Sequence, residues 1–157
     1  KNYNNLKALA TSQAVKPRVM CEVKSGSAWY VSGGRSTTGK LYADAGADYV
    51  FSSYPNAGGV PLSFETVFDK AQDADVWLMK YNHPTDKTYQ SLQEDYAPYA
   101  NFKAFKDKNI YHCNTAYRPY YEDFPFHPDR VLKDLIKIFH PSLLPEYELK
   151  YFSKLAE

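Results

Sequence analysis

Short apolar runs alternate with helix-like segments along almost the whole chain, and this alternation limits the folds that it can adopt. The runs typical of strands are 18–23, 29–31, 49–51, 75–79 and 110–113. The second of these fits the rim of a loop as well as a strand. Parallel strands need long crossover connections, which are usually helices, so the alternation favours a largely parallel sheet. We therefore expect an α/β fold of three layers, with helices on both faces of the sheet.

Helix signals fill the spaces between these runs. Helices are expected at 3–10, after 36 to about 45, at 64–72, in pieces between 85 and 107, at 131–139 and from Pro145 onwards. The residue Ser63 is a good N-cap because its hydroxyl can accept a hydrogen bond from a free backbone N–H. The last predicted helix would carry Leu149, Phe152 and Leu155.

Composition excludes several classes of protein. Of 157 residues, 44% are hydrophobic, which rules out a disordered chain. The 19 basic and 18 acidic side chains leave a net charge of +1, so charge gives no reason to expect a nucleic-acid partner or an anionic membrane surface. Cys21 and Cys113 lack a metal-binding or redox spacing and are expected to be small buried hydrophobes, which does not settle the cellular compartment.

Ligands of a parallel α/β sheet bind beyond the carboxyl ends of its strands. The loops expected at that edge are 25–36, 52–61, 80–85 and 114–128. Trp29 and Tyr30 would either pack at the rim or offer a stacking surface to a flat ligand. Four side chains of the last loop would either pack within it or donate hydrogen bonds to an anionic or chelated ligand: Tyr117, Arg118, Tyr120 and Tyr121. The guanidinium of Arg118 is the most suggestive, because it offers several fixed donors.

Two alternative functions rest on short motifs. Residues 34–40 match the first seven positions of a phosphate-binding loop, but Leu41 occupies the eighth, where magnesium chemistry needs a hydroxyl. One alternative is therefore an α/β enzyme that binds a nucleotide phosphate at the 33–40 glycine loop. The histidines show no metal-ligand spacing, and a metal-ion receptor using His83 is the other. A purely structural or interaction domain, whose loops are filled by their own side chains, is a third alternative. His112 is most simply a structural histidine. No nucleophile with an identifiable base stands out, so no catalytic residue is predicted.

Several segments occur in a characteristic order: Lys16-Pro-Arg-Val19, Trp29-Tyr-Val-Ser-Gly-Gly-Arg-Ser36, Leu41-Tyr-Ala-Asp-Ala-Gly46, Pro61-Leu-Ser-Phe-Glu-Thr-Val67, Gln72-Asp-Ala-Asp-Val-Trp77, Asp129-Arg-Val-Leu-Lys-Asp-Leu135 and His140-Pro-Ser-Leu-Leu-Pro-Glu-Tyr-Glu-Leu149. Together they resemble the carboxyl-terminal lobe of the substrate-binding proteins of ABC importers for iron-siderophores, haem and cobalamin. The resemblance implies one Rossmann-like lobe of a two-lobe protein. Residues 1–14 would be the tail of the helix connecting the lobes, and 15–157 the carboxyl-terminal lobe.

The resemblance also implies a function. A ferric siderophore, haem or a corrinoid would be held non-covalently between this lobe and a missing amino-terminal lobe, then delivered to an ABC permease in the inner membrane. No enzymatic step and no cofactor are expected. The location would be periplasmic or extracytoplasmic, and the protein would be held at the membrane by a lipid anchor on an absent amino-terminal segment.

Particular residues acquire roles from the same resemblance. Tyr30, Gly33, Gly34, Gly59, Tyr117 and Arg118 would line the cleft. Trp29 and His83 join them because of their positions beside the glycine turn and after a buried strand. Glu65 would otherwise be explained by the helix dipole, but it matches the carboxylate that docks onto arginines of the permease.

Overall fold

A five-stranded sheet lies at the centre of the structure, a computed structural model that describes residues 2–157. Its order is β4-β1-β6-β7-β8. The first four strands are parallel: β1 (Arg18–Cys21), β4 (Asp48–Tyr49), β6 (Val76–Tyr81) and β7 (Ile110–Asn114). The fifth, β8 (Ser153–Lys154), runs antiparallel to β7. The first four residues of β6 are buried, as expected for a strand covered on both faces.

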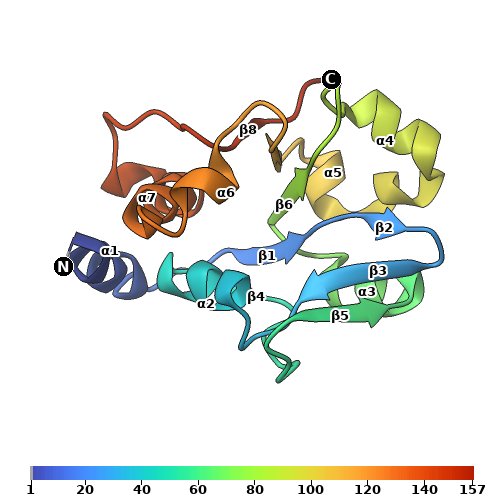
Figure 1. Cartoon of the computed structure of the whole chain (residues 1–157). Helices are drawn as coiled ribbons and strands as arrows, with labels where there is room; N and C mark the ends of the chain where they lie inside the picture. Colours follow the sequence, from blue (N-terminus) through green and yellow to red (C-terminus); the bar gives the residue numbers. More distant parts are fainter. Residues whose placement is uncertain (1) are drawn as a thin grey trace.

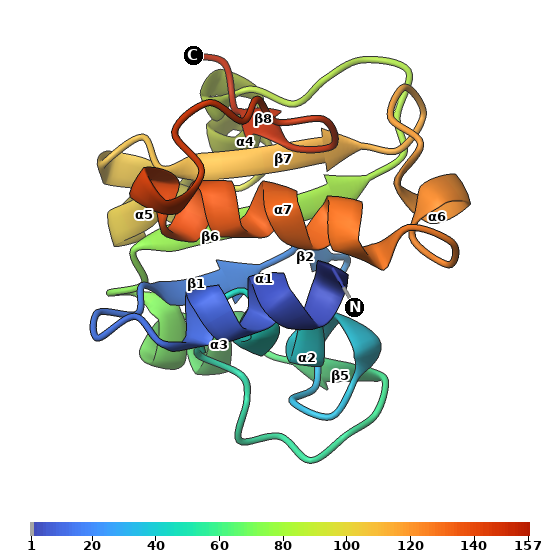
Figure 2. The same ribbon diagram turned by 90° about the vertical axis from the view of Figure 1, so that its left-hand side faces the viewer.

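Helices cover both faces, which confirms the predicted three-layer α/β fold. One layer contains α1 (Asn2–Thr11), α2 (Thr37–Asp44) and α7 (Pro128–Phe139), which contact one another. Figure 2 shows α1 and α7 side by side in front of the sheet. The opposite layer contains α4 (Tyr89–Asp95), a 3-10 turn at Ala97–Asn101 and α5 (Lys103–Lys106), on the right in Figure 1. No helix within residues 2–157 is long and apolar enough to cross a membrane.

A second, smaller sheet lies beside the first. It joins β2 (Lys24–Ser25), β3 (Ala28–Ser32) and β5 (Gly59–Leu62) in antiparallel order and packs against α3 (Phe64–Ala71). The run at 29–31 is therefore a strand, but it belongs to this second sheet. Gly59 was expected in a loop, whereas it begins β5 and pairs with Ser32.

The carboxyl-terminal segment differs from the prediction. After α7 the chain forms a 3-10 turn at Pro141–Leu143 and then extends into β8, so the helix expected from Pro145 is wrong. The cause is Asp134, wholly buried on α7. Its carboxylate accepts hydrogen bonds from the N–H groups of residues 150–152, which in a helix would donate to carbonyls four residues earlier.

Candidate functional site

The strand order reverses at β1, because β4 lies on one side of it and β6 on the other. Such a reversal opens a crevice at the carboxyl ends of the strands. In Figure 2 the arrows of β6 and β7 point to the right, toward the side where α6 (Tyr120–Asp123) lies. The segments at this edge include 22–23 after β1, 82–88 after β6 and 115–119 after β7. Sequence reasoning selected the last two regions correctly as loops at the strand ends.

Glu22 and Lys80 stand at the reversal itself, at the end of β1 and near the end of β6. Glu22 has a φ of 68°, and its carboxylate Oε1 accepts a hydrogen bond of 3.1 Å from the backbone N–H of Lys80. Burial raises the pKa of Glu22, and Lys80 opposes that shift. Burial lowers the pKa of Lys80, but the side chains of Tyr120 and Glu22 outweigh it, and the net direction is upward. The sequence analysis singled out neither residue, although Lys80 directly follows the apolar run 75–79 and Glu22 is the acidic residue within the run 18–23.

Tyr117 and Arg118 line a polar cavity of about 370 Å³ at the end of β7. The hydroxyl of Tyr117 donates to the carbonyl of Pro84, and Arg118 Nη1 donates to the carbonyl of Lys150 over 2.7 Å. His83 lies beside the cavity, where its backbone N–H donates to the side-chain oxygen of Asn114 over 3.2 Å. The structure therefore brings three predicted site residues together at one end of the sheet.

The glycine turn after β3 is closed by the chain's own backbone. The N–H groups of Gly33, Gly34 and Arg35 donate to the carbonyls of residues 58, 54 and 56. A Cβ at Gly33 would collide with the carbonyl of Asn56, and one at Gly34 with that of Ser52. These glycines thus permit two backbone segments to touch. Their N–H groups do not form a free anion-binding site, which removes support for the nucleotide alternative. A position of Gly33 and Gly34 at the cleft stays a prediction.

Trp29 is another correction. Its side chain is wholly buried, its Nε1 donates to the carbonyl of Cys21 over 3.0 Å, and its ring lies 5.9 Å from that of Trp77. It therefore packs in the core and presents no surface to a ligand. Its neighbour Tyr30 is 55% exposed on the outer side of β3, opposite Pro61 on β5. Gly59 is also exposed on this small sheet, apart from the cavity of Tyr117 and Arg118.

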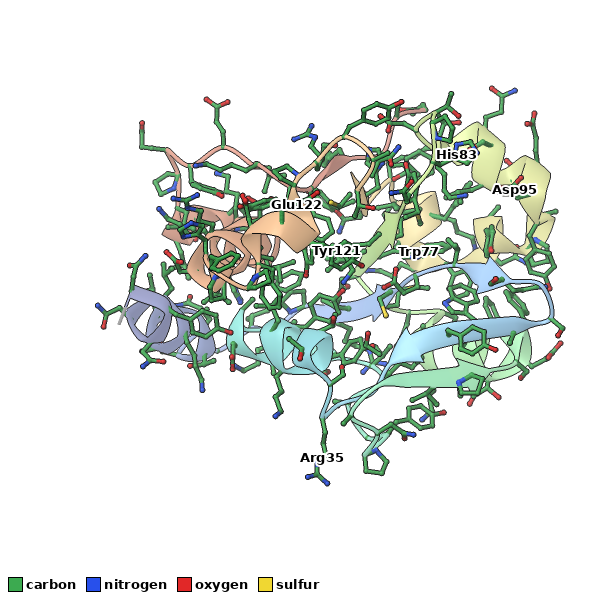
Figure 3. The ribbon with its side chains drawn as sticks, in the orientation of Figure 1. Arg35, Trp77, His83, Asp95, Tyr121 and Glu122 are labelled. Atoms are coloured by element: carbon green, nitrogen blue, oxygen red, sulfur yellow. The ribbon has the colours of Figure 1, made fainter. Side chains whose placement is uncertain are left out.

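Figure 3 shows how the labelled side chains lie. Tyr121 on α6 is near the centre of the view, and His83 is near the top right. Arg35, next to the glycine turn, projects away from the ribbon at the bottom. Tyr121 is 61% exposed, while its neighbour Tyr120 is buried.

The predictions for His112 and for the two cysteines agree with the structure. His112 is buried, and its ring nitrogens meet the hydroxyls of Tyr81 at 2.7 Å and Ser153 at 3.2 Å, as expected of a structural histidine. Cys21 and Cys113 are both buried and free. Within residues 2–157 no group of three or more His, Cys, Asp or Glu side chains is arranged to hold a metal ion.

Glu65 is exposed in the first turn of α3. The helix is capped by Ser63, whose hydroxyl accepts from the N–H of Thr66 over 3.1 Å, as the sequence predicted. Glu65 forms no hydrogen bond or ion pair with the part of the chain that the structure describes. Its carboxylate is therefore open to a partner.

Comparisons with known proteins agree on a family. The family model described as periplasmic binding protein matches residues 1–117. An uncharacterized lipoprotein of Methanocaldococcus jannaschii is 30% identical over 108 residues, which are 68% of this chain and 24% of that protein.

Among solved structures, the TroA-like periplasmic binding protein FepB of Veillonella parvula superposes with a TM-score of 0.74 at 15% identity, over 98% of this chain and 53% of that one. IsdE of S. aureus, solved in complex with heme, superposes with a TM-score of 0.62 at 16% identity, over 88% and 53%. At these identities the superpositions show the fold alone. The chain spans about a quarter of the lipoprotein and about half of each solved chain.

Proposed function

Because the chain belongs to the periplasmic binding protein family, we propose that it forms the carboxyl-terminal lobe of a solute-binding protein that delivers its ligand to an ABC importer. The family match over residues 1–117 carries this proposal. The superposition over half of each solved chain supports the view that a second, amino-terminal lobe supplies the other wall of the cleft. Helix α1 would be the tail of the connecting helix, with Lys1 outside the described residues.

The proposed ligand is a ferric siderophore, haem or a corrinoid. Flat or chelated ligands of this kind need aromatic surface together with a few fixed donors. Arg118 and His83 would offer donors at the end of β7, and the exposed rings of Tyr117 and Tyr30 would offer aromatic faces. Binding would be non-covalent. The heme complex of the structurally similar IsdE supports a tetrapyrrole as one candidate.

A single lobe leaves one face of the ligand in water, and binding pockets normally bury most of a ligand's surface. We therefore expect this chain alone to bind a chelate weakly or not at all, and the natural polypeptide that contains it together with a second lobe (the two-lobe protein) to bind it tightly. All three candidate ligands are coloured, so absorption titrations of both proteins measure this difference. Equal affinities would refute the proposed shared cleft, and no binding by the two-lobe protein would refute the proposed ligand class.

Docking onto the permease is the role proposed for Glu65, whose carboxylate is exposed on α3. Glu65→Arg reverses the charge that would meet arginines of the permease. We expect normal ligand binding by this variant and loss of importer-dependent uptake. The matched control is Glu146→Arg, which makes the same charge reversal at an exposed residue between α7 and β8 and should transport normally. Normal uptake by the Glu65 variant would remove the docking role.

The proposed location is outside the cytoplasmic membrane, with a lipid anchor attached to an amino-terminal segment. The description of the 30% identical relative as a lipoprotein supports this. Labelling of intact cells with a membrane-impermeant reagent tests it, and labelling only after lysis would contradict it.

A further inference from the structure

The amino end of α1 lies at the same edge of the molecule as the carboxyl ends of the parallel strands. Asn2 Nδ2 donates a hydrogen bond of 3.0 Å to the carboxylate of Asp129, which is in the first turn of α7. In Figure 2 this end of α1 is on the right, the side toward which the arrows of β6 and β7 point. Polypeptide that precedes α1 in the two-lobe protein would therefore start from this edge.

This end of α1 is held to α2 as well as to α7. The hydroxyl of Tyr3 donates to the carboxylate of Asp44 over 2.6 Å, and Lys7 Nζ lies 3.6 Å from the other oxygen of that carboxylate. Asp44 belongs to α2, so both contacts join the two helices. Because α1 is fixed to the lobe near its amino end, upstream polypeptide would leave it in a defined direction.

An apolar groove of about 320 Å³ lies beside this end of α1, between α2 and the segment 124–128. Its apolar walls come from the ring of Tyr3, from Leu41 on α2, and from Phe124 and Pro128. The upstream polypeptide would therefore begin directly beside an open apolar surface.

Phe126 extends this surface. It lies two residues from both Phe124 and Pro128, and its side chain is 79% exposed. The N–H groups of Phe126 and His127 donate to the carbonyl of Asp123 over 3.1 and 2.7 Å, so a hydrogen-bonded turn holds the ring in this exposed position. Aromatic rings are typical of interfaces, because burial of such a ring removes a large apolar area from water.

The partner that fits this surface best is the polypeptide upstream of α1. The chain covers only 53% of FepB and 53% of IsdE, so about half of each of these proteins has no counterpart in it. A tethered segment has a high effective concentration at a surface next to its attachment point, so it occupies that surface ahead of a separate protein. The apolar walls of the groove call for apolar side chains on that segment.

We propose that Phe126 and the neighbouring groove form a contact between this lobe and the second lobe, and that polypeptide upstream of α1 covers them in the two-lobe protein. The inference rests on the proposed function, since it requires a second lobe. The groove shares no lining residue with the cavity of Tyr117 and Arg118. The contact therefore joins the lobes and fixes their relative position, and it does not bind the ligand.

The test is the variant Phe126→Ser, made both in this chain and in the two-lobe protein and followed by thermal unfolding. In the chain alone the ring is already exposed, so the Tm should shift by less than about 1 °C. In the two-lobe protein the variant loses buried apolar area, and the Tm of this lobe should fall by about 3–8 °C. The matched control is Val15→Ser, because Val15 is 80% exposed and follows the carboxyl end of α1. It should shift neither Tm by more than about 1 °C.

Hydrogen exchange of the unmodified proteins tests the same contact without a substitution. The amides of Phe126 and His127 should exchange at least about tenfold more slowly in the two-lobe protein than in the chain alone. Equal exchange in the two proteins, or equal Tm shifts of Phe126→Ser in both, would overturn the contact. Self-association of the chain alone that Phe126→Ser abolishes would also overturn it, because a second copy would then be the occupant.

Absorption titrations of the two-lobe protein with a ferric tris-catecholate, haem and cobalamin separate this inference from the proposed function. If the two-lobe protein binds one of them tightly while Phe126 stays unprotected, the contact is wrong and the proposed function stands. If Phe126 is protected and none of the three binds, the contact is supported and the proposed ligand class is wrong.

Discussion

The stability contributed by the buried side chain of Asp134 is the quantity that the structure predicts most directly. Asp134 is wholly buried on α7, and its carboxylate accepts hydrogen bonds from the hydroxyl of Tyr147 at 2.6 Å and from the N–H groups of Lys150, Tyr151 and Phe152 at 3.0, 2.8 and 2.9 Å. Hydrogen bonds to a charged group contribute about 1.5–3 kcal/mol each. Part of that sum is offset by the desolvation of the carboxylate, and some of the released donors would reach water.

Asp134→Ala should therefore lower the free energy of unfolding by about 4 kcal/mol, within the range for breaking a buried charged network. Urea denaturation followed by circular dichroism measures this. Asp134→Asn keeps one acceptor oxygen and should lose about half as much. The control Asp129→Ala removes a carboxylate from the first turn of the same helix and should cost no more than about 1 kcal/mol. A loss of less than about 1.5 kcal/mol in Asp134→Ala would refute this explanation of the carboxyl-terminal segment.

Two further changes test the glycine turn and the buried histidine. Gly34→Ala places a Cβ against the carbonyl of Ser52 and should lower the free energy of unfolding by about 1–3 kcal/mol. The control Gly58→Ala has open space around its Cβ and should be nearly neutral. Equal effects of the two variants in urea denaturation would contradict the close approach of the two segments. Burial lowers the pKa of His112 in the folded state, so the unfolded state takes up a proton first and stability, fully present above about pH 6.5, falls as the pH drops below it. His112→Gln should flatten this slope between about pH 7.5 and 5.5, and an unchanged slope would contradict the assignment to His112.

Local signals in the sequence predicted much of the fold. The apolar run at 75–79 forms the buried strand β6. Ser63 caps α3, where its hydroxyl accepts a hydrogen bond from a backbone N–H. These features depend on neighbouring residues, so a single sequence is enough to predict them. The carboxyl-terminal helix failed because a carboxylate 16 residues earlier, Asp134, captures the N–H of Lys150. Such a contact has no local signature.

The candidate site was less predictable for the same reason. Tyr117 and Arg118 could be placed at the edge of the sheet because they follow the end of a predicted strand. Trp29 alternates with Tyr30 on a strand, and the sequence could not tell which of the two faces the core. The glycine turn resembled an anion site, but its N–H groups are occupied by residues 54–58, a pairing that only the folded chain reveals. Lys80 was not singled out because its position beside the reversal depends on the order of the strands in the sheet.

The central claim is that the carboxyl edge of the sheet forms one wall of a ligand cleft. The measurement that tests it most directly is nuclear magnetic resonance of the chain with an excess of ferric tris-catecholate, because the paramagnetic iron broadens the amide signals of residues near it even when binding is weak. We predict broadening at the strand-end segments, in particular at Val23, His83, Tyr117 and Tyr121. Broadening confined to the opposite edge of the sheet, around Asp73 and Lys108, would contradict the account.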